Sequence, residues 1–243
     1  MRVRQPLLTG WMLIVGLVVL APLGRADDQK ENTAIKPVPR DEKWMKRHAL
    51  FLERAKKGDV DVLFLGDSIT QGWEGNGKEV WKEHFEPLKA VNFGIGGDRT
   101  QHVLWRITEG KELEGIQPKV AVLMIGTNNL SNNTNEEIAE GVTAIVKELG
   151  RQRPQTKVLL LGIFPRGAKP DDKNRERIKA INAMLAKLDD GKQIRFLDIG
   201  AKFLDADGNL SKEIMYDFLH LTPKGYQIWA EAIKPVLLEM LRG

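Results

Sequence analysis

The sequence contains no cysteine among its 243 residues. This absence excludes a thiol nucleophile, a disulfide framework and a zinc site built on thiolates. Histidine is also scarce, with four in the chain. Transition-metal sites in proteins draw heavily on imidazole and thiolate ligands, which are scarce or absent here. We therefore expect no metal centre, and we expect no cofactor. The fold must then be stabilised by its hydrophobic core alone.

Long hydrophobic runs are absent except at the N-terminus. Residues 1–26 combine a basic start, an apolar stretch from Trp11 to Leu20 and the small residues Gly24 and Ala26. This pattern is typical of a secretory signal peptide, and the apolar stretch is shorter than the roughly 20 residues of a spanning helix. We predict cleavage after Ala26 and export to the periplasm or the medium, with no transmembrane domain left after cleavage. An uncleaved anchor is the alternative.

A strong excess of one charge is absent too. The predicted leader holds Arg2, Arg4 and Arg25 and no acidic residue, so it contributes three of the 37 basic residues and none of the 33 acidic ones. The rest of the chain is nearly neutral and carries no long Lys/Arg block. Nucleic-acid binding is therefore not expected.

Residues 27–40 are polar, contain Pro37 and Pro39, and are predicted to be a linker. From residue 41 to residue 243, apolar runs alternate with longer amphipathic segments. The predicted strands cover 60–66, 89–94, 119–126, 157–164 and 194–199, and the predicted helices cover 41–57, 79–88, 100–109, 136–151, 172–188 and 224–241. Strands that are hydrophobic on both faces and separated by helices predict a parallel sheet covered on both sides. We therefore expect one α/β domain with three layers.

Small and polar residues follow the first three predicted strands. The first strand runs into Asp67 and Ser68, the second into the glycines of "NFGIGGD", and the third into "GTNN". The active sites of open α/β sheets lie outside the carboxyl ends of the strands. The three segments are therefore expected to meet at one edge of the sheet.

A serine needs a base, usually histidine, to become a nucleophile. His220 is the candidate, because Asp217 precedes it by three positions and the two side chains can face the same side of one turn. Asp217 could hold the Nδ1 proton while Nε2 accepts the proton of Ser68. The remaining histidines fall in predicted amphipathic helices, where packed or surface imidazoles are expected: His48, His84 and His102.

The same segments offer donors for an oxyanion. The glycines of residues 94–97 free the backbone to point an N–H group at the site, and Asn128 supplies a side-chain amide. A nucleotide site is disfavoured because neither Gly-x-Gly-x-x-Gly nor the lysine of a phosphate loop is present. The surroundings of Ser68 also lack the second glycine of the Gly-x-Ser-x-Gly elbow, which disfavours an ordinary α/β-hydrolase.

Four blocks, "GDSIT", "NFGIGGD", "GTNN" and "DFLHLT", stand in this order and resemble the SGNH (GDSL-type) hydrolase family. The longer stretches "NFGIGGDRTQHVLWRI" and "DFLHLTPKGY" resemble more narrowly the catalytic subunits of platelet-activating factor acetylhydrolase Ib and their bacterial relatives. The resemblance runs from about residue 41 to the C-terminus. It implies a flavodoxin-like α/β/α sandwich with a five-stranded parallel sheet, the SGNH hydrolase fold.

The resemblance also implies roles for single residues. Ser68 would be the nucleophile, with Asp67 as its flanking acid, and its own amide would join the Gly97 N–H and the Asn128 side chain in the oxyanion hole. Asp217 would orient His220, the base. Asn129 departs from the broad family, where many members have Asp, but the narrower group shares "GTNN".

The substrate implied is a small acyl ester, with acetyl as the expected acyl group and a sugar, glycan or lipid as the alcohol. Bulky neighbours of the triad shorten the acyl pocket in the acetylhydrolase subgroup, and Ile69 and Leu219 occupy those positions here. Core packing is the alternative for both. Trp73, Trp81 and Trp105 could line a sugar site or belong to the core. The resemblance makes a homodimer possible.

We therefore expect an exported serine esterase that works by a Ser-His-Asp mechanism. A non-catalytic binding protein on the same fold is one alternative. A polysaccharide deacetylase and a metal-dependent phosphodiesterase using Asp67, Asp217 and His220 as ligands are the others. The motifs hold few further metal ligands, which disfavours the last of these.

Overall fold

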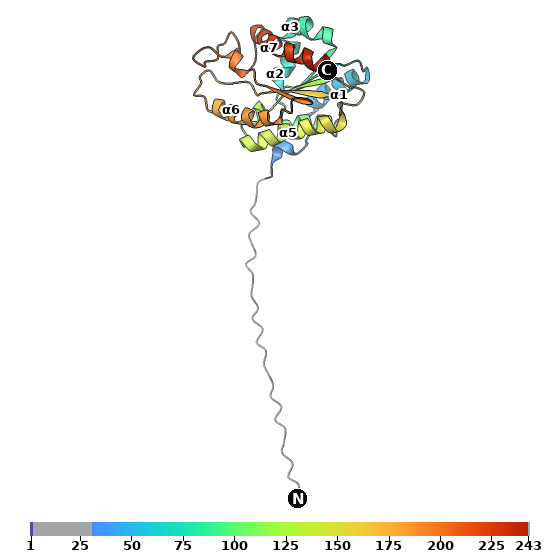
Figure 1. Ribbon diagram of the computed structural model, residues 1–243. Helices are drawn as coiled ribbons and strands as arrows, with labels where there is room; N and C mark the ends of the chain where they lie inside the picture. The colour runs from blue at the N-terminus through green and yellow to red at the C-terminus, as the bar shows by residue number, and fades with distance from the viewer. Residues whose placement is uncertain (2–30, 243) are drawn as a thin grey trace. The chain divides into compact units, whose positions relative to one another are not determined.

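The computed structural model describes Met1 and residues 31–242 (Figure 1). The predicted signal peptide lies outside the described residues, apart from Met1. The compact unit begins at Asn32, before the predicted domain start at residue 41.

A parallel sheet forms the centre of this unit. Its strands are β1 (Val62–Gly66), β2 (Ala90–Gly94), β3 (Val120–Met124), β4 (Lys157–Leu161) and β5 (Ile194–Leu197). They lie in the order β2-β1-β3-β4-β5, which is the flavodoxin-like order. The register pairs Gly66 at the end of β1 with Gly94 of β2 and Met124 of β3, so three chain segments leave the sheet side by side. The predicted fold class and all five predicted strands are confirmed.

Helices alternate with these strands. The α-helices are α1 (Glu42–Lys56), α2 (Ser68–Gln71), α3 (Lys78–His84), α4 (Thr100–Ile107), α5 (Asn135–Gln152), α6 (Lys173–Leu185) and α7 (Pro223–Arg242). Short 3₁₀ turns are η1 (Thr33–Ile35), η2 (Gly72–Glu74), η3 (Glu86–Leu88), η4 (Thr127–Asn129), η5 (Ala186–Leu188) and η6 (Gly200–Phe203). The predicted helix 79–88 is divided into α3 and η3, where Pro87 has no N–H to continue the α-helical pattern.

The side chains of each strand alternate between two hydrophobic layers. Leu63 and Leu65 of β1 pack into the layer that contains residues of α1, α4, α5 and α6. Val62 and Phe64 pack into the opposite layer, with residues of α7 and the segment from α2 to η3. Figure 1 shows α5 and α6 on one side of the sheet and α3 and α7 on the other. The sheet is thus covered on both faces, as the hydrophobic strands predict.

Tryptophans belong to these layers. Trp73 is 1% exposed and packs with Phe64 and Trp229 on the α7 side. Trp81 also contacts Phe64, and Trp105 packs on Trp44 of α1. Trp73 therefore belongs to the core, whereas Trp81 and Trp105 pack on neighbouring rings and stay partly exposed.

The described part of the predicted linker is packed on the domain. Ala34 of η1 is fully buried, and the Thr100 hydroxyl donates to its carbonyl oxygen at 2.8 Å. Arg40 forms an ion pair of 3.0 Å with Asp98, in the loop after β2. These contacts bring residues just before α1 to the edge of the sheet where the candidate site lies. Among the residues that the structure describes, no helix is both long enough and apolar enough to cross a membrane.

Candidate active site

The nucleophile candidate sits on a tight turn between β1 and α2. Asp67 caps α2, because its Oδ1 accepts the N–H of Ile69 at 2.9 Å, and Ser68 is the first residue of the helix. Gly66 makes this turn possible. A Cβ at that position would lie 2.1 Å from the Thr70 hydroxyl and 2.5 Å from the Met124 carbonyl oxygen. The absence of a side chain lets α2 fold closely onto the strand end.

The structure brings Ser68, His220 and Asp217 together. Ser68 Oγ lies 2.9 Å from His220 Nε2, and His220 Nδ1 lies 2.7 Å from Asp217 Oδ2. The other oxygen of Asp217 accepts the backbone N–H groups of Leu219 and His220. Partial burial acts to raise the pKa of Asp217, but these hydrogen bonds outweigh it and hold the pKa below its ordinary value. The carboxylate is therefore suited to orient the imidazole.

The loop that carries Asp217 and His220 contains a strained residue. Phe218 has φ 60°, in the left-handed region that a bulky side chain rarely adopts. Its N–H donates to Met215, and its carbonyl oxygen accepts the N–H of Gly167 in the loop after β4. The left-handed conformation of Phe218 reverses the chain direction, so that the Asp217 carboxylate reaches the N–H groups of Leu219 and His220. Strain of this kind is usually found where surrounding contacts fix a functional geometry.

The oxyanion donors come from three strand ends. Within residues 31–242 the N–H groups of Ser68 and Gly97 have no intramolecular hydrogen-bond partner, whereas the Gly96 N–H donates to Gln71 Oε1 at 2.7 Å. Gly97 adopts φ 77°, and the Asp98 N–H closes the turn onto Ile95. These features leave Gly97, rather than Gly96, free to donate to a substrate.

Asn128 lies on η4 after β3, and its side-chain amide donates to the Asp98 carbonyl oxygen at 2.9 Å. The turn that contains Gly97 and the Asn128 side chain are therefore joined. A side-chain NH₂ carries two hydrogens, so one remains for an oxyanion.

Asn129 has a different task from its neighbour. It is fully buried, and its Oδ1 accepts the Thr100 N–H at 3.0 Å at the start of α4. Its NH₂ group lies 3.0–3.1 Å from oxygens of Thr100, Gln101 and Asn133. Asn129, at the position where many members of the broad family have Asp, therefore fixes α4 and η4 to each other.

Asp67 is a buried acid with an unpartnered oxygen. Its Oδ2 has no hydrogen-bond partner among the described residues. Burial raises the pKa of Asp67 to about 7, and the opposing effects of the Ile69 N–H and the Arg166 charge are smaller. Arg166 reaches this region from the loop after β4 and donates to the Thr127 hydroxyl at 3.3 Å. Arg166 stands in the stretch "LGIFPRG", which resembles the acetylhydrolase subunits, but sequence reasoning assigned it no role.

The two predicted pocket residues differ in exposure. Ile69 is 1% exposed, packs in the hydrophobic layer under α7, and its carbonyl oxygen accepts the Tyr226 hydroxyl at 2.6 Å. Its side chain belongs to the core, so the pocket prediction is not supported for Ile69. Leu219 is half-buried and packs against the edge of the same layer.

The remaining histidines are packed between helices, as expected. His48 is buried between Glu112 and the Gly110 carbonyl oxygen. His102 accepts the Arg99 N–H, and burial lowers its pKa to about 4. The last of them, His84, lies beside α7. None of the three contacts Ser68.

A cleft of about 570 Å³ lies beside Gly96, and Ser68 is not among the residues that line it. Its wall includes Gln71 and Gly96, and a Cβ on Gly96 would lie 3.7 Å from the Cβ of Ser68. The segment before α1 and the N-terminal part of α1 add basic side chains, which the sequence motifs did not reveal: Arg40, Lys43, Lys46 and Arg47.

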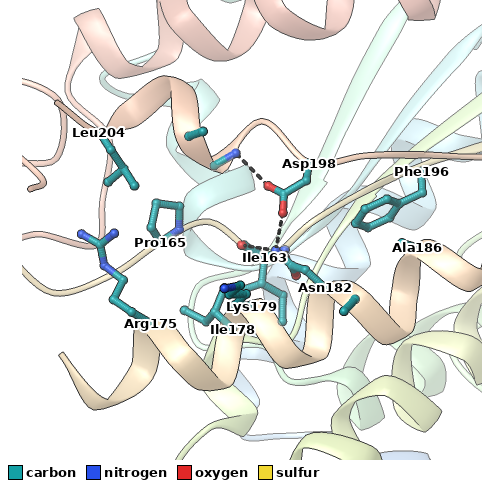
Figure 2. A pocket seen from close by; sticks show the side chains of 13 residues that line it. Ile163, Pro165, Arg175, Ile178, Lys179, Asn182, Ala186, Phe196, Asp198 and Leu204 are labelled. Atoms are coloured by element: carbon teal, nitrogen blue, oxygen red, sulfur yellow. Dashed lines mark hydrogen bonds between the residues drawn. The ribbon is translucent and has the colours of Figure 1, made fainter. Parts of the chain in front are cut away.

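A second cavity, of about 550 Å³, lies between α6 and η6 and contains none of the predicted site residues (Figure 2). Figure 2 shows Asp198 on its wall, where the carboxylate accepts hydrogen bonds from Asn182 and Gly200.

The model of the GDSL-like lipase/acylhydrolase family matches residues 64–228, a span that includes Ser68, Gly97, Asn128, Asp217 and His220. The chain belongs to this family. It is an ester hydrolase, as its relatives also indicate. Platelet-activating factor acetylhydrolase IB subunit alpha2 of Gallus gallus is 43% identical and covers 83% of this chain and 86% of its own. Subunit alpha1 of Rattus norvegicus is 42% identical, with coverage of 87% and 91%.

The fold is shared more widely. A GDSL-like lipase from Bacteroides thetaiotaomicron superposes with a TM-score of 0.63 at 20% identity and covers 81% of this chain and 96% of its own. The resemblance read from the four sequence blocks is thereby confirmed, together with the sandwich architecture.

Asp67 makes the stability of this GDSL-family hydrolase dependent on pH. Its pKa in the folded state, about 7, exceeds the ordinary 3.8, so the folded protein keeps a proton that the unfolded chain loses between these values. The stabilisation is complete below the lower pKa and is lost as the pH rises through the upper one. Asp67→Asn keeps an acceptor for the Ile69 N–H and carries no proton to lose.

We expect the unfolding free energy of Asp67→Asn, relative to the wild type, to rise by about 2 kcal/mol from about pH 5 to about pH 7. Urea unfolding of both proteins at each pH measures the difference. If the unfolding free energies of the two proteins change in parallel with pH, the buried carboxyl is already ionised at the lower pH.

Proposed function

We propose that this ester hydrolase is an exported serine esterase that removes short acyl groups, acetyl above all, through Ser68, His220 and Asp217. The observation that carries the proposal is the continuous chain of contacts from Ser68 Oγ to His220 Nε2 and from His220 Nδ1 to Asp217 Oδ2. A nucleophile, a base and an orienting acid stand in the order that acyl transfer needs.

In the proposed reaction His220 Nε2 takes the proton of Ser68 as Oγ attacks the ester carbonyl carbon. The carbonyl oxygen becomes an oxyanion, which the N–H groups of Ser68 and Gly97 and the Asn128 amide stabilise. His220 then gives the proton to the leaving alcohol, and the acyl group stays on Ser68. Water, activated by His220, releases the acid and restores the serine.

The acetyl preference rests on the relatives, whose name is platelet-activating factor acetylhydrolase. We place the alcohol part of the ester in the cleft beside Gly96 and Gln71, because Gly96, on the wall of this cleft, directly precedes Gly97 and lies close to the Ser68 side chain. Export follows from the leader pattern of residues 1–26. Homodimerisation stays a prediction from the resemblance.

Ser68→Ala should lower kcat for p-nitrophenyl acetate by a factor on the order of 10⁴ or more, because the covalent step is lost. The unfolding midpoint in urea should change little, since Ser68 is only partly buried and the substitution removes a single hydroxyl. A fluorophosphonate probe should label the wild type and not the variant. Full activity in Ser68→Ala would remove Ser68 from the mechanism, and an unlabelled wild type would favour a non-catalytic binding protein.

The acyl preference is tested with p-nitrophenyl esters of increasing chain length. We expect kcat/KM to be highest for acetate and to fall at least about tenfold by octanoate, because longer chains need a pocket that Leu219 narrows. Acetylated phospholipid and acetylated oligosaccharide, compared in the same assay, separate the lipid and glycan alcohols. A preference for octanoate would overturn the acetyl assignment.

Export is tested by expressing the full chain in a Gram-negative host and sequencing the N-terminus of the recovered protein. Recovery in the periplasmic fraction with a new N-terminus at Asp27 is the expected result. A protein that stays in the cytoplasm with residues 1–26 intact would contradict export.

A further inference from the structure

A buried ion pair lies behind the oxyanion donors. Asp98 and Arg106 are both fully buried, and Asp98 Oδ2 lies 3.2 Å from Arg106 Nε. We propose that this pair positions the oxyanion hole, so that its two members are positioning residues for the reaction and do not touch the substrate. The inference rests on the esterase function proposed above.

Asp98 contacts two of the three donor segments. It follows Gly97 directly, and its own N–H closes the turn that gives Gly97 its left-handed conformation. Its carbonyl oxygen accepts the Asn128 side chain at 2.9 Å. A displacement of Asp98 would therefore move both the Gly97 N–H and the Asn128 amide.

The Asp98 side chain is held from several sides. Oδ1 accepts Trp44 Nε1 at 2.6 Å and Arg40 Nη1 at 3.0 Å, while Oδ2 faces Arg106. A buried carboxylate is costly unless such partners surround it, so its place is closely defined. The contacts come from α1, α4 and the segment before α1, which fixes the turn to three separate parts of the fold.

Arg106 extends the support to the third donor segment. Its Nη1 donates to the Phe93 carbonyl oxygen at 2.7 Å, in the strand that leads to Gly97. Its Nη2 lies 3.5 Å from the Gly66 carbonyl oxygen, just before Asp67 and Ser68. The Ile95 N–H donates to the same Gly66 oxygen at 3.2 Å, so the ends of β1 and β2 are joined above the guanidinium.

Preorganised donors stabilise an oxyanion only if they already point at its position, because a donor that must move has to be reoriented during the reaction. Ground-state binding of an ester depends much less on these donors. Loosening of the pair should therefore lower kcat and leave KM nearly unchanged.

Glu112 provides a matched control. It is as deeply buried as Asp98 and pairs with the same Arg106, with Oε1 at 3.0 Å from Nη1. Its other oxygen lies 2.8 Å from His48 Nδ1. Asp98→Asn and Glu112→Gln each remove one buried negative charge next to Arg106, but only Asp98 also adjoins Gly97 and accepts the Asn128 side chain through its backbone.

The experiment compares these two variants with the wild type. The readouts are kcat and KM for p-nitrophenyl acetate, the inhibition constant of a trifluoromethyl ketone, which adds to Ser68 as a tetrahedral oxyanion, and the urea midpoint. Both variants should lose stability. Asp98→Asn alone should lower kcat by about 10- to 100-fold, with a matching loss of trifluoromethyl ketone affinity and an unchanged KM.

If Asp98→Asn and Glu112→Gln lose kcat equally, the pair only stabilises the fold and the inference is overturned. A change in KM with an unchanged kcat would also overturn it. If Asp98→Asn does not fold, Trp44→Phe removes one donor to Asp98, and Trp105→Phe changes the ring that packs on Trp44 without touching Asp98. A kcat loss in Trp44→Phe alone supports the inference, and equal values in both oppose it.

Ser68→Ala separates this inference from the proposed function. If the wild type hydrolyses the ester, Ser68→Ala does not, and Asp98→Asn keeps full kcat, then only the role of the pair is refuted. If Ser68→Ala retains the activity of the wild type, the proposed function itself fails.

Discussion

A contact of 2.9 Å between Ser68 Oγ and His220 Nε2 joins two residues that are 152 positions apart in the chain. Several features of the structure position the two residues of this contact. Gly66 lets α2 begin directly at the end of β1, which fixes Ser68. The strained Phe218 turns the second loop so that Asp217 can hold the His220 ring. The position of β1 between β2 and β3 gives the nucleophile a rigid base.

Charge burial is the second constraint on this edge of the sheet. Arg106 is surrounded by Asp98, Glu112 and backbone carbonyl oxygens, so the cost of removing it from water is offset by several partners. Asp67 lies close by with one oxygen unpartnered, and burial favours its neutral form. The same low-dielectric surroundings that make these groups costly also strengthen the electrostatic effect of donors aimed at an oxyanion.

Much of the fold and the site was accessible from the sequence, because apolar runs and turn residues follow directly from strand and loop geometry. The five strands, the parallel sheet and the three residues that meet at the site were all predicted from such patterns. The errors have a common origin. Ile69 was predicted to shape the acyl pocket and Trp73 to line a sugar site, with core packing as the alternative for each. Both are core residues, because burial depends on which helix packs over them. The segment before α1 was predicted to be a linker, although Ala34 and Arg40 are held by contacts with distant loops.

The sequence by itself determined the chemistry: a serine at a strand end, an Asp-x-x-His turn, glycines for backbone donors, and no cysteine for any thiol alternative. These depend on residue type and short-range spacing, which a single chain displays openly. Only the tertiary structure decided which N–H groups stay free, and that Asp98 and Arg106 lie together beneath the donors. Those outcomes depend on contacts between segments far apart in the chain, where hydrogen bonds and burial are set by packing and leave no local pattern.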